Sequence, residues 1–284
     1  MSFIENLEKD YKKLETLGAE KILIGKTVLN RPIYAFAVGC GEPKIIAQYA
    51  IHAREYITYY LANLHIIKML KTLKHGQGTI YFVPIVNIDG VGLVLDGLSS
   101  VPNEKQDLLK KLEPNLDFSR WKANIRAVDL NVNFPAKWGL GKSNLRVPNF
   151  QNYIGEFPAS EPETQCLMNF TKQIKPDLTL SFHSKGEVIY YDFHQKLCVK
   201  HKHKQIAKVA SRSTGYKIEP TGKSAGGYKD WCIMECNIPA LTIEVGQDFL
   251  THPIKIEALP QIWQKNENIM LDLLEFLRKK SIKN

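Results

Sequence analysis

The chain lacks the features that define several protein classes. Its 284 residues contain no apolar run long enough to span a membrane, no internal repeat and no low-complexity segment. Its five cysteines are odd in number and include no Cys-x-x-Cys pair, which favours reduced thiols over a disulfide framework or a structural zinc knuckle. The first segment, MSFIENLEKDYKKLETLG, has apolar residues at helical spacing and lacks the apolar core of a signal peptide. We therefore expect a cytoplasmic protein with no membrane partner.

The charge balance is basic but gives no sign of a nucleic-acid partner. The formal net charge is +9, and the basic residues are spread along the chain without any nucleic-acid-binding motif. This distribution favours a solvated basic surface. The apolar fraction of 44% and the charged fraction of 24% are typical of globular proteins. The length fits a single large domain, predicted to span residues 1–284, and the sequence does not indicate the oligomeric state.

Apolar strands alternate with helical segments along the chain. Two continuously apolar segments, 44–51 and 79–87, flank a predicted helix at 56–73, and this order indicates parallel strands joined by a crossover helix. Further strands are predicted at 21–28, 32–39, 178–182, 187–191 and 239–245, and further helices at 4–17, 161–174, 197–214 and 256–280. Residues 98–160 lack lasting periodicity and are predicted to be long loops with short helices, which usually carry function.

Candidate metal ligands follow two of the predicted strands. His52 and Glu55 stand three residues apart after the strand at 44–51, a spacing that can chelate one ion. Alone this pattern is weak, because a capping or packed histidine explains His52 equally well. His183 also follows a strand, and residues after the carboxyl ends of neighbouring strands converge in α/β sheets. Two histidines and one glutamate form a catalytic zinc set, so we predict one Zn²⁺ per chain.

Two further carboxylates have candidate roles beside this metal. Glu244 lies inside the apolar strand at 239–245 and is predicted to be a general base that takes a proton from the attacking water. The simpler alternative is a strand-end glutamate that faces solvent. Asp129 could accept the other N–H of His52 and so orient its ring, although a residue of this type is also common in turns.

The segments HAREY, AVDLN, SFHS and TIEVG, in this order and together with GGYKDW and SEPETQ, resemble the zinc carboxypeptidase family (peptidase family M14) known from pancreatic carboxypeptidases A and B. The resemblance runs from about residue 31 to 245. It implies an α/β fold with a mixed, mostly parallel eight-stranded sheet flanked by helices. It also implies a zinc ion held by His52, Glu55 and His183, with Glu244 as the catalytic base.

The same resemblance implies roles for residues that would bind substrate. Arg126 matches an arginine that polarises the scissile carbonyl and stabilises the oxyanion. Asn131 matches an asparagine that binds the terminal carboxylate of the substrate. The arginine that clamps this carboxylate in digestive members is replaced by Val132, and the position of their mobile tyrosine corresponds to Gly222. We therefore expect poor release of ordinary C-terminal amino acids.

The combination of DLNVNFP with SFHSKGEVIYY is more similar to bacterial γ-D-glutamyl-meso-diaminopimelate peptidases. The expected partner is a small peptide substrate, a muropeptide derived from the cell wall. Lys185 and Lys229 are candidates for binding its carboxylates, and Arg54 for secondary substrate contacts. Each of these three residues is also explained as an ordinary surface residue.

Three other functions remain open from the sequence. An ordinary metallocarboxypeptidase would release C-terminal amino acids. A zinc amidohydrolase that deacylates amino acids uses a similar ligand set, but GGYKDW and SEPETQ disfavour it. An inactive peptidase that only binds wall peptides would lack a ligand or Glu244, and all four of these residues are present. The sequence therefore predicts an active zinc metallopeptidase.

Overall fold

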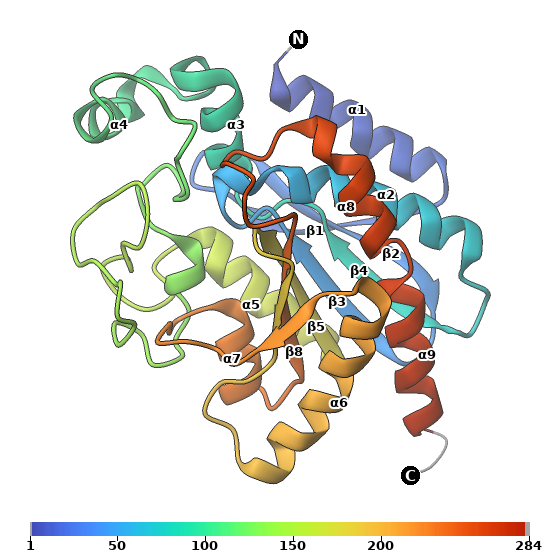
Figure 1. The fold of residues 1–284 in the computed structure, drawn as a ribbon. Helices are drawn as coiled ribbons and strands as arrows, with labels where there is room; N and C mark the ends of the chain where they lie inside the picture. Colours follow the sequence, from blue (N-terminus) through green and yellow to red (C-terminus); the bar gives the residue numbers. More distant parts are fainter. Residues whose placement is uncertain (1, 282–284) are drawn as a thin grey trace.

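A computed structural model describes residues 2–281, and its centre is one eight-stranded sheet (Figure 1). The strands follow the order β1-β2-β4-β3-β5-β8-β6-β7 across the sheet. Their bounds are β1 Glu20–Lys26, β2 Pro32–Cys40, β3 Lys44–Tyr49, β4 Gly78–Val83, β5 Leu178–Ser184, β6 Val188–Tyr190, β7 Lys217–Glu219 and β8 Ala240–Val245.

The four central strands, β4, β3, β5 and β8, are parallel. Antiparallel pairing is confined to β1 with β2, β2 with β4 and β6 with β8, while β7 pairs in parallel with β6. Central parallel strands are covered on both faces, which explains why the segments 44–51 and 79–87, which contain β3 and most of β4, are largely apolar. The predicted mixed, mostly parallel eight-stranded sheet is confirmed. Periodicity did not reveal β7, because it has only three residues.

Helices cover both faces of the sheet. Their bounds are α1 Phe3–Thr16, α2 Ile57–Thr72, α3 Ile88–Asp96, α4 Asp107–Leu112, α5 Pro162–Ile174, α6 Leu197–Thr214, α7 Tyr228–Met234, α8 Leu259–Asn266 and α9 Ile269–Ser281. Helix α2 packs across β2, β3, β4 and β5 and contacts α1, α8 and α9, whereas α5 packs on β1 and α7 on β5 and β8 (Figure 1). None of these helices, within residues 2–281, is long and apolar enough to cross a bilayer.

Residues 97–161 form the long loop region beside the sheet, drawn mainly in green in Figure 1. It contains α4 and the short 3-10 helices Gly97–Ser100, Asn103–Lys105 and Leu130–Val132, as the composition predicted. The region has a small apolar core of its own, in which Trp121 and Phe118 are buried together with Ala53. Because Ala53 adjoins His52, this second core holds the loop region against the carboxyl ends of the central strands, where the predicted ligands lie.

The predicted helix at 256–280 is wrong in one respect, because α8 ends at Asn266 and α9 begins at Ile269. The carbonyl of Asn266 accepts a hydrogen bond from His65 Nε2 at 2.9 Å, and Tyr49 Oη donates to His65 Nδ1 at 2.9 Å. Burial lowers the pKa of His65 to about 4, so the ring is neutral and can make both bonds. The His65 side chain, on α2, thus makes the hydrogen bond to the Asn266 carbonyl that a backbone N–H of the next turn would make in a continuous helix.

The segment SEPETQ starts α5 and carries a buried carboxyl group. Pro162 occupies the first turn, where its missing N–H is harmless. Glu163 Oε1 accepts from the backbone N–H of Val28 at 3.1 Å, and Asn124 Nδ2 donates to Glu161 Oε2 at 2.7 Å. Burial raises the pKa of Glu163 from 4.5 to about 8, and the nearby carboxyl of Asp89 adds to the effect. Glu163 is therefore mostly protonated near neutral pH.

We predict that Glu163 makes the stability of the protein fall as the pH rises. Its folded pKa is raised above the unfolded value, so its contribution is complete below about pH 4.5 and is lost as the pH passes about 8. The slope should approach about 1.4 kcal/mol per pH unit between these values. Glu163→Gln, which does not ionise, should flatten the change in Tm between about pH 6 and 9 in thermal melts.

The exposed Glu156→Gln variant is the matched control, because it makes the same chemical change on the surface. Its Tm should follow that of the wild type across the whole pH range. Parallel pH profiles for wild type and Glu163→Gln would show that the Glu163 carboxyl does not stay protonated in the folded protein.

Candidate metal centre

Three buried side chains with metal-binding atoms converge at the carboxyl ends of the central strands β3 and β5. His52 lies just after β3, Glu55 ends the 3-10 helix Ala53–Glu55, and His183 lies near the end of β5. His52 Nδ1 is 2.9 Å from Glu55 Oε1, and His183 Nδ1 is 3.1 Å from Glu55 Oε2. The structure thus brings together the three ligands that the sequence predicted.

The orientation of the two rings fits a shared metal ion. The Nδ1 atoms of His52 and His183 are 3.0 Å apart, and both face the carboxylate of Glu55. Lone pairs on two neutral imidazoles and a carboxylate repel one another at this distance unless a cation or a proton lies between them. Two nitrogens and one carboxylate oxygen are a catalytic zinc set that leaves an open position. The donor set therefore fits zinc.

Backbone contacts hold this arrangement in place. The N–H of Ala53 donates to the carbonyl of Lys122 at 3.1 Å and ties the ligand segment to the loop region. Thr58 Oγ1 donates to the carbonyl of Glu55 at 2.8 Å, and the N–H of Ser184 donates to Glu55 Oε2 at 3.2 Å. Both ends of Glu55 are therefore fixed by groups that belong to different elements.

Asp129 lies behind His52, as the sequence suggested, and is fully buried. Its Oδ1 is 3.2 Å from His52 Nε2, and its Oδ2 is 3.0 Å from Lys122 Nζ. Burial alone would raise the pKa of Asp129, but Lys122 and His52 together bring it well below its usual value. A charged Asp129 keeps the proton of His52 on Nε2 and leaves the lone pair of Nδ1 directed at the ligand cluster.

Glu244 lies beside the cluster in β8, where it is the direct strand partner of His183. Burial raises the pKa of Glu244 to about 7; His183 opposes this increase and the carboxylate of Glu55 adds to it. The positive charge of a bound metal ion would lower this value. Glu244 is thus a carboxyl group in an apolar strand that is positioned to exchange a proton next to the ligands.

A cavity of about 460 Å³ opens in front of these residues. His52, His183 and Glu244 contribute to its wall, and the predicted substrate residues Asn131 and Lys229 also line it. So do Val132 and Gly222, the positions where an arginine and a tyrosine were expected from digestive carboxypeptidases. Asn131 Oδ1 accepts from the backbone N–H of Tyr228 at 3.1 Å, which holds its side chain at the wall.

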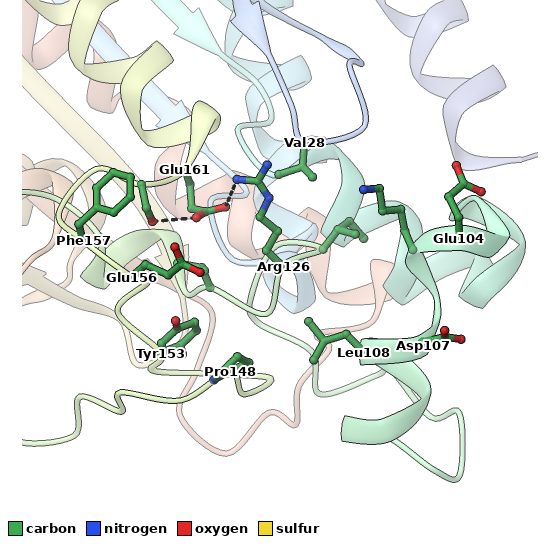
Figure 2. A pocket seen from close by; sticks show the side chains of 14 residues that line it. Val28, Glu104, Asp107, Leu108, Arg126, Pro148, Tyr153, Glu156, Phe157 and Glu161 are labelled. Atoms are coloured by element: carbon green, nitrogen blue, oxygen red, sulfur yellow. Dashed lines mark hydrogen bonds and ion pairs between the residues drawn. The ribbon is translucent and has the colours of Figure 1, made fainter.

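The structure does not bring Arg126 to this cavity, although the sequence predicted a catalytic role for this residue beside the ligands. Arg126 lines a separate cavity of about 520 Å³, where its Nη1 is 3.8 Å from Glu161 Oε2 (Figure 2). Figure 2 shows its side chain directed at Glu161, and Tyr153 and Phe157 belong to the wall of the same cavity. The prediction followed from the likeness of the segment before AVDLN, but a turn at Asn124–Ala127 directs Arg126 away from the ligands.

Lys122 is the basic residue that sequence reasoning missed. It lines the cavity of His52 and Glu244, and its ammonium group pairs with Asp129. No periodicity marks the position of Lys122, because it lies in an irregular loop. Its place depends on the hydrogen bond between its carbonyl and Ala53 N, a contact between segments about seventy residues apart that spacing alone does not reveal.

The other predicted substrate residues differ in their surroundings. Lys229 is buried, and its Nζ donates to Asp230 Oδ1 at 2.6 Å and to the carbonyl of Asp192 at 2.9 Å. Lys185 is directed at Asp248, with Nζ 3.2 Å from Oδ1, and does not line the cavity. Arg54 also lies outside the lining, although its charge lowers the pKa of Glu244 and therefore acts on the site.

The chain belongs to the zinc carboxypeptidase family, whose model matches residues 1–269. It is therefore a peptide-bond hydrolase of a family that uses zinc, as the sequence predicted, and the cluster of His52, Glu55 and His183 fits this cofactor.

One relative is gamma-D-glutamyl-L-diamino acid endopeptidase 1 of Lysinibacillus sphaericus, which is 34% identical over 92% of this chain and 69% of its own length. Among solved structures, bovine thrombin-activatable fibrinolysis inhibitor has a TM-score of 0.77 at 19% identity, covering 96% of this chain and 97% of its own. Murein-tripeptide amidase MpaA of Escherichia coli O157 has a TM-score of 0.61 at 20% identity, covering 91% and 94%. The two structures confirm the predicted fold class.

We predict that the purified protein holds about one zinc ion per chain and that His52→Ala or His183→Ala abolishes this binding, because two remaining ligands cannot hold a catalytic ion. Asp129→Asn should weaken zinc affinity by about 10- to 100-fold, since it loses the charge that orients His52. Metal analysis after dialysis against a graded chelator measures both effects.

The exposed His75→Ala variant should keep its zinc and serves as the control for removing a histidine. Glu244→Gln should also keep its zinc but lose turnover by about 10²- to 10⁴-fold, the usual contribution of a general base. Retention of a full zinc complement by both His52→Ala and His183→Ala would show that the ion binds elsewhere.

Proposed function

We propose that this zinc peptidase hydrolyses the γ-D-glutamyl-meso-diaminopimelate amide bond of small peptides derived from the cell wall. The protein would act in the cytoplasm through one catalytic domain formed by residues 1–284. The name of the 34%-identical relative supports this substrate class. The observation that carries the proposal is the cavity itself, where Val132 replaces the expected arginine while several lysines line the wall. Such a wall favours carboxylates at positions that an ordinary C-terminal residue does not offer.

Four side chains beside the cavity carry out the hydrolysis, three as metal ligands and one as the general base. His52, Glu55 and His183 hold the zinc ion, which when bound polarises the scissile carbonyl and increases the acidity of water. Glu244 takes a proton from the attacking water and then transfers it to the leaving amine. Its apolar strand environment raises the pKa of this carboxyl and so strengthens it as a base.

Lys122 is the candidate for the electrophilic role that was expected of Arg126. Its ammonium group lies in the cavity and is held by Asp129, which also holds His52. A fixed cation at this place stabilises the negative charge that develops on the carbonyl oxygen after attack. Because Asp129 contacts both residues, one carboxylate positions the Lys122 ammonium group and the His52 ring.

Lys229 and Asp230 form an ion pair that fits the far end of diaminopimelate. Both residues line the cavity, and Lys229 Nζ is 2.6 Å from Asp230 Oδ1. The far end of diaminopimelate carries an ammonium group and a carboxylate on one carbon, so it can align with such a pair. Lys185 and Arg54, which lie outside the lining, would contact only parts of the substrate beyond the cavity.

We predict that Lys122→Ala lowers kcat by about 10²- to 10³-fold with little change in KM, because the oxyanion exists only after the carbonyl is attacked. Arg126→Ala makes a comparable change in the second cavity and should stay within about twofold of wild type. Steady-state kinetics on one cleaved substrate compare the two variants. The reverse pattern would restore Arg126 to the catalytic role.

We predict that the tripeptide L-Ala-γ-D-Glu-meso-diaminopimelate is cut to L-Ala-D-Glu and free diaminopimelate. Acyl dipeptides ending in Phe or Arg should be nearly inert, because their side chains lack the ammonium and carboxylate groups of diaminopimelate that can align with Lys229 and Asp230. Replacing diaminopimelate by lysine removes one carboxylate and should clearly lower kcat/KM. Digestion of this panel, read by mass spectrometry, makes the test.

The zinc-loaded Glu244→Gln variant is the negative control, because any cleavage in its presence would come from a contaminating peptidase. Efficient cleavage of the Phe or Arg dipeptides without activity on the tripeptide would identify an ordinary metallocarboxypeptidase instead. Release of the acyl group from acylated amino acids, with all peptides intact, would identify an amidohydrolase.

A further inference from the structure

The second cavity, which contains Arg126, has no part in the proposed reaction. Its volume is about 520 Å³, and its wall comes from the segment around α4, from residues 125–128 and from the loop at 148–161 (Figure 2). The three metal ligands do not line it, and neither does Glu244. A cavity of this size is typical of binding sites for small molecules.

The most deeply buried charge in the wall of the second cavity is the carboxylate of Glu161, which is 2% exposed. Its oxygens accept hydrogen bonds from Ser160 Oγ at 2.8 Å and from Asn124 Nδ2 at 2.7 Å, and both of these donors are neutral. Arg126 Nη1 is 3.8 Å from Glu161 Oε2, which is beyond hydrogen-bond distance. Because a buried carboxylate is costly without a close cation, the cavity favours a ligand that brings one.

Exposed carboxylates lie on both sides of Arg126. Figure 2 shows Glu156 beside Glu161 on one side, and Glu104 and Asp107 on the other. We call the first two the loop pair and the last two the helix pair. Within residues 2–281, the three exposed carboxylates of these pairs have no ion-pair partner. Two separate groups of negative charge are therefore available to one ligand.

The wall of the second cavity is negative overall. Its two cations, Arg126 and Lys105, stand against the four carboxylates of the loop pair and the helix pair. Burial raises the pKa of the Tyr153 hydroxyl in the same wall, and the charges of Glu156 and Glu161 raise it further. A ligand with two ammonium groups fits this distribution of charge.

Apolar side chains lie between the two pairs of carboxylates. Ile125, Val128 and Tyr153 are buried in the wall, and Leu108 of α4 is half-buried. Figure 2 shows Leu108 between the loop pair and the helix pair. A hydrocarbon chain that packs on these side chains is removed from water, which stabilises the complex. The wall thus offers apolar surface between two charged ends.

We propose that the second cavity binds a free diamino acid, whose two ammonium groups contact the loop pair and the helix pair and whose carboxylate contacts Arg126. The carbon chain between the ammonium groups then lies on the apolar wall. Lysine and diaminopimelate both have these groups, and Lys105 can pair with the second carboxylate that only diaminopimelate carries. This inference goes beyond the proposed function, because it follows from the wall of a second site and concerns binding without turnover.

Isothermal titration calorimetry of the zinc-loaded protein tests the site with a matched set of ligands. Lysine should bind, and diaminopimelate should bind more tightly because it makes one more ion pair. Norleucine lacks the second ammonium group and cadaverine lacks the carboxylate, so each should bind at least about tenfold more weakly than lysine. Equal affinities for lysine and norleucine would overturn the inference. So would equal affinities for lysine and cadaverine, because the cavity would then attract positive charge alone.

Two variants assign the binding to the second cavity. Glu161→Gln removes the buried charge with little change of shape, and Arg126→Gln removes the cation between the two pairs of carboxylates. Each should weaken the binding of diaminopimelate by about tenfold or more. Because the Arg126 side chain is 56% exposed, its replacement should leave the fold intact even if Glu161→Gln is unstable. Arg126→Lys, which keeps the charge, should retain part of the affinity.

Matched controls make the same changes elsewhere. Glu20→Gln and Arg212→Gln remove a carboxylate and a guanidinium group from exposed positions outside both cavities, and they should bind as wild type does. Asp230→Asn changes the catalytic cavity, where diaminopimelate can bind as a product, and should leave the second site unaffected. Loss of all binding in Asp230→Asn, with wild-type affinity in Arg126→Gln, would refute the second site. These titrations measure no turnover, so failure of the proposed reaction would not change their outcome.

Discussion

The parallel pairing of β3, β5 and β8 is the constraint on which the site depends. Parallel strands have their carboxyl ends on the same side of the sheet, so the predicted ligands after β3 and at the end of β5 meet Glu244, the predicted base, in β8. The register pairs Tyr49 with Phe182 and His183 with Glu244. A slip of one residue would move His183 to the opposite face, where helices cover the sheet. Burial of both faces of these strands prevents such a slip.

Paired buried charges then give the site its rigidity. Glu55 contacts both histidines, and Asp129 connects His52 to Lys122. Each buried charge has a partner, and removal of one member would leave the other uncompensated in a low-dielectric environment. The second apolar core, around Trp121, keeps the Lys122 segment in contact with Ala53. The loop region thus helps to hold the segment of His52 and Glu55 in place, although it has little regular structure.

The sequence predicted those parts of the fold and site that follow from local pattern. His52, Glu55 and His183 were predicted together because each histidine follows an apolar strand and Glu55 stands three residues after His52. The sequence did not reveal that Lys122 lies beside the cluster and Arg126 away from it, because both lie in an irregular loop whose course depends on long-range hydrogen bonds. The break between α8 and α9 was missed for the same reason, since it depends on His65 from another helix. Local periodicity contains no information about such contacts.

The buried groups of the metal cluster and the lysines at the mouth of the cavity are held by different parts of the molecule. The cluster of His52, Glu55 and His183, at the carboxyl ends of the central strands, is buried, and its electrostatic interactions are strong because water is excluded. Lys142 and Lys223, by contrast, are exposed on loops, and salt screens exposed charges over about 8 Å at physiological ionic strength. Because Val132 stands where the resemblance to digestive carboxypeptidases would place an arginine, the 3-10 helix Leu130–Val132 offers no cation of its own to a substrate carboxylate. Loops vary without disturbing the sheet, so a family with one set of zinc ligands can acquire different substrates by changing the residues at the mouth of the cavity.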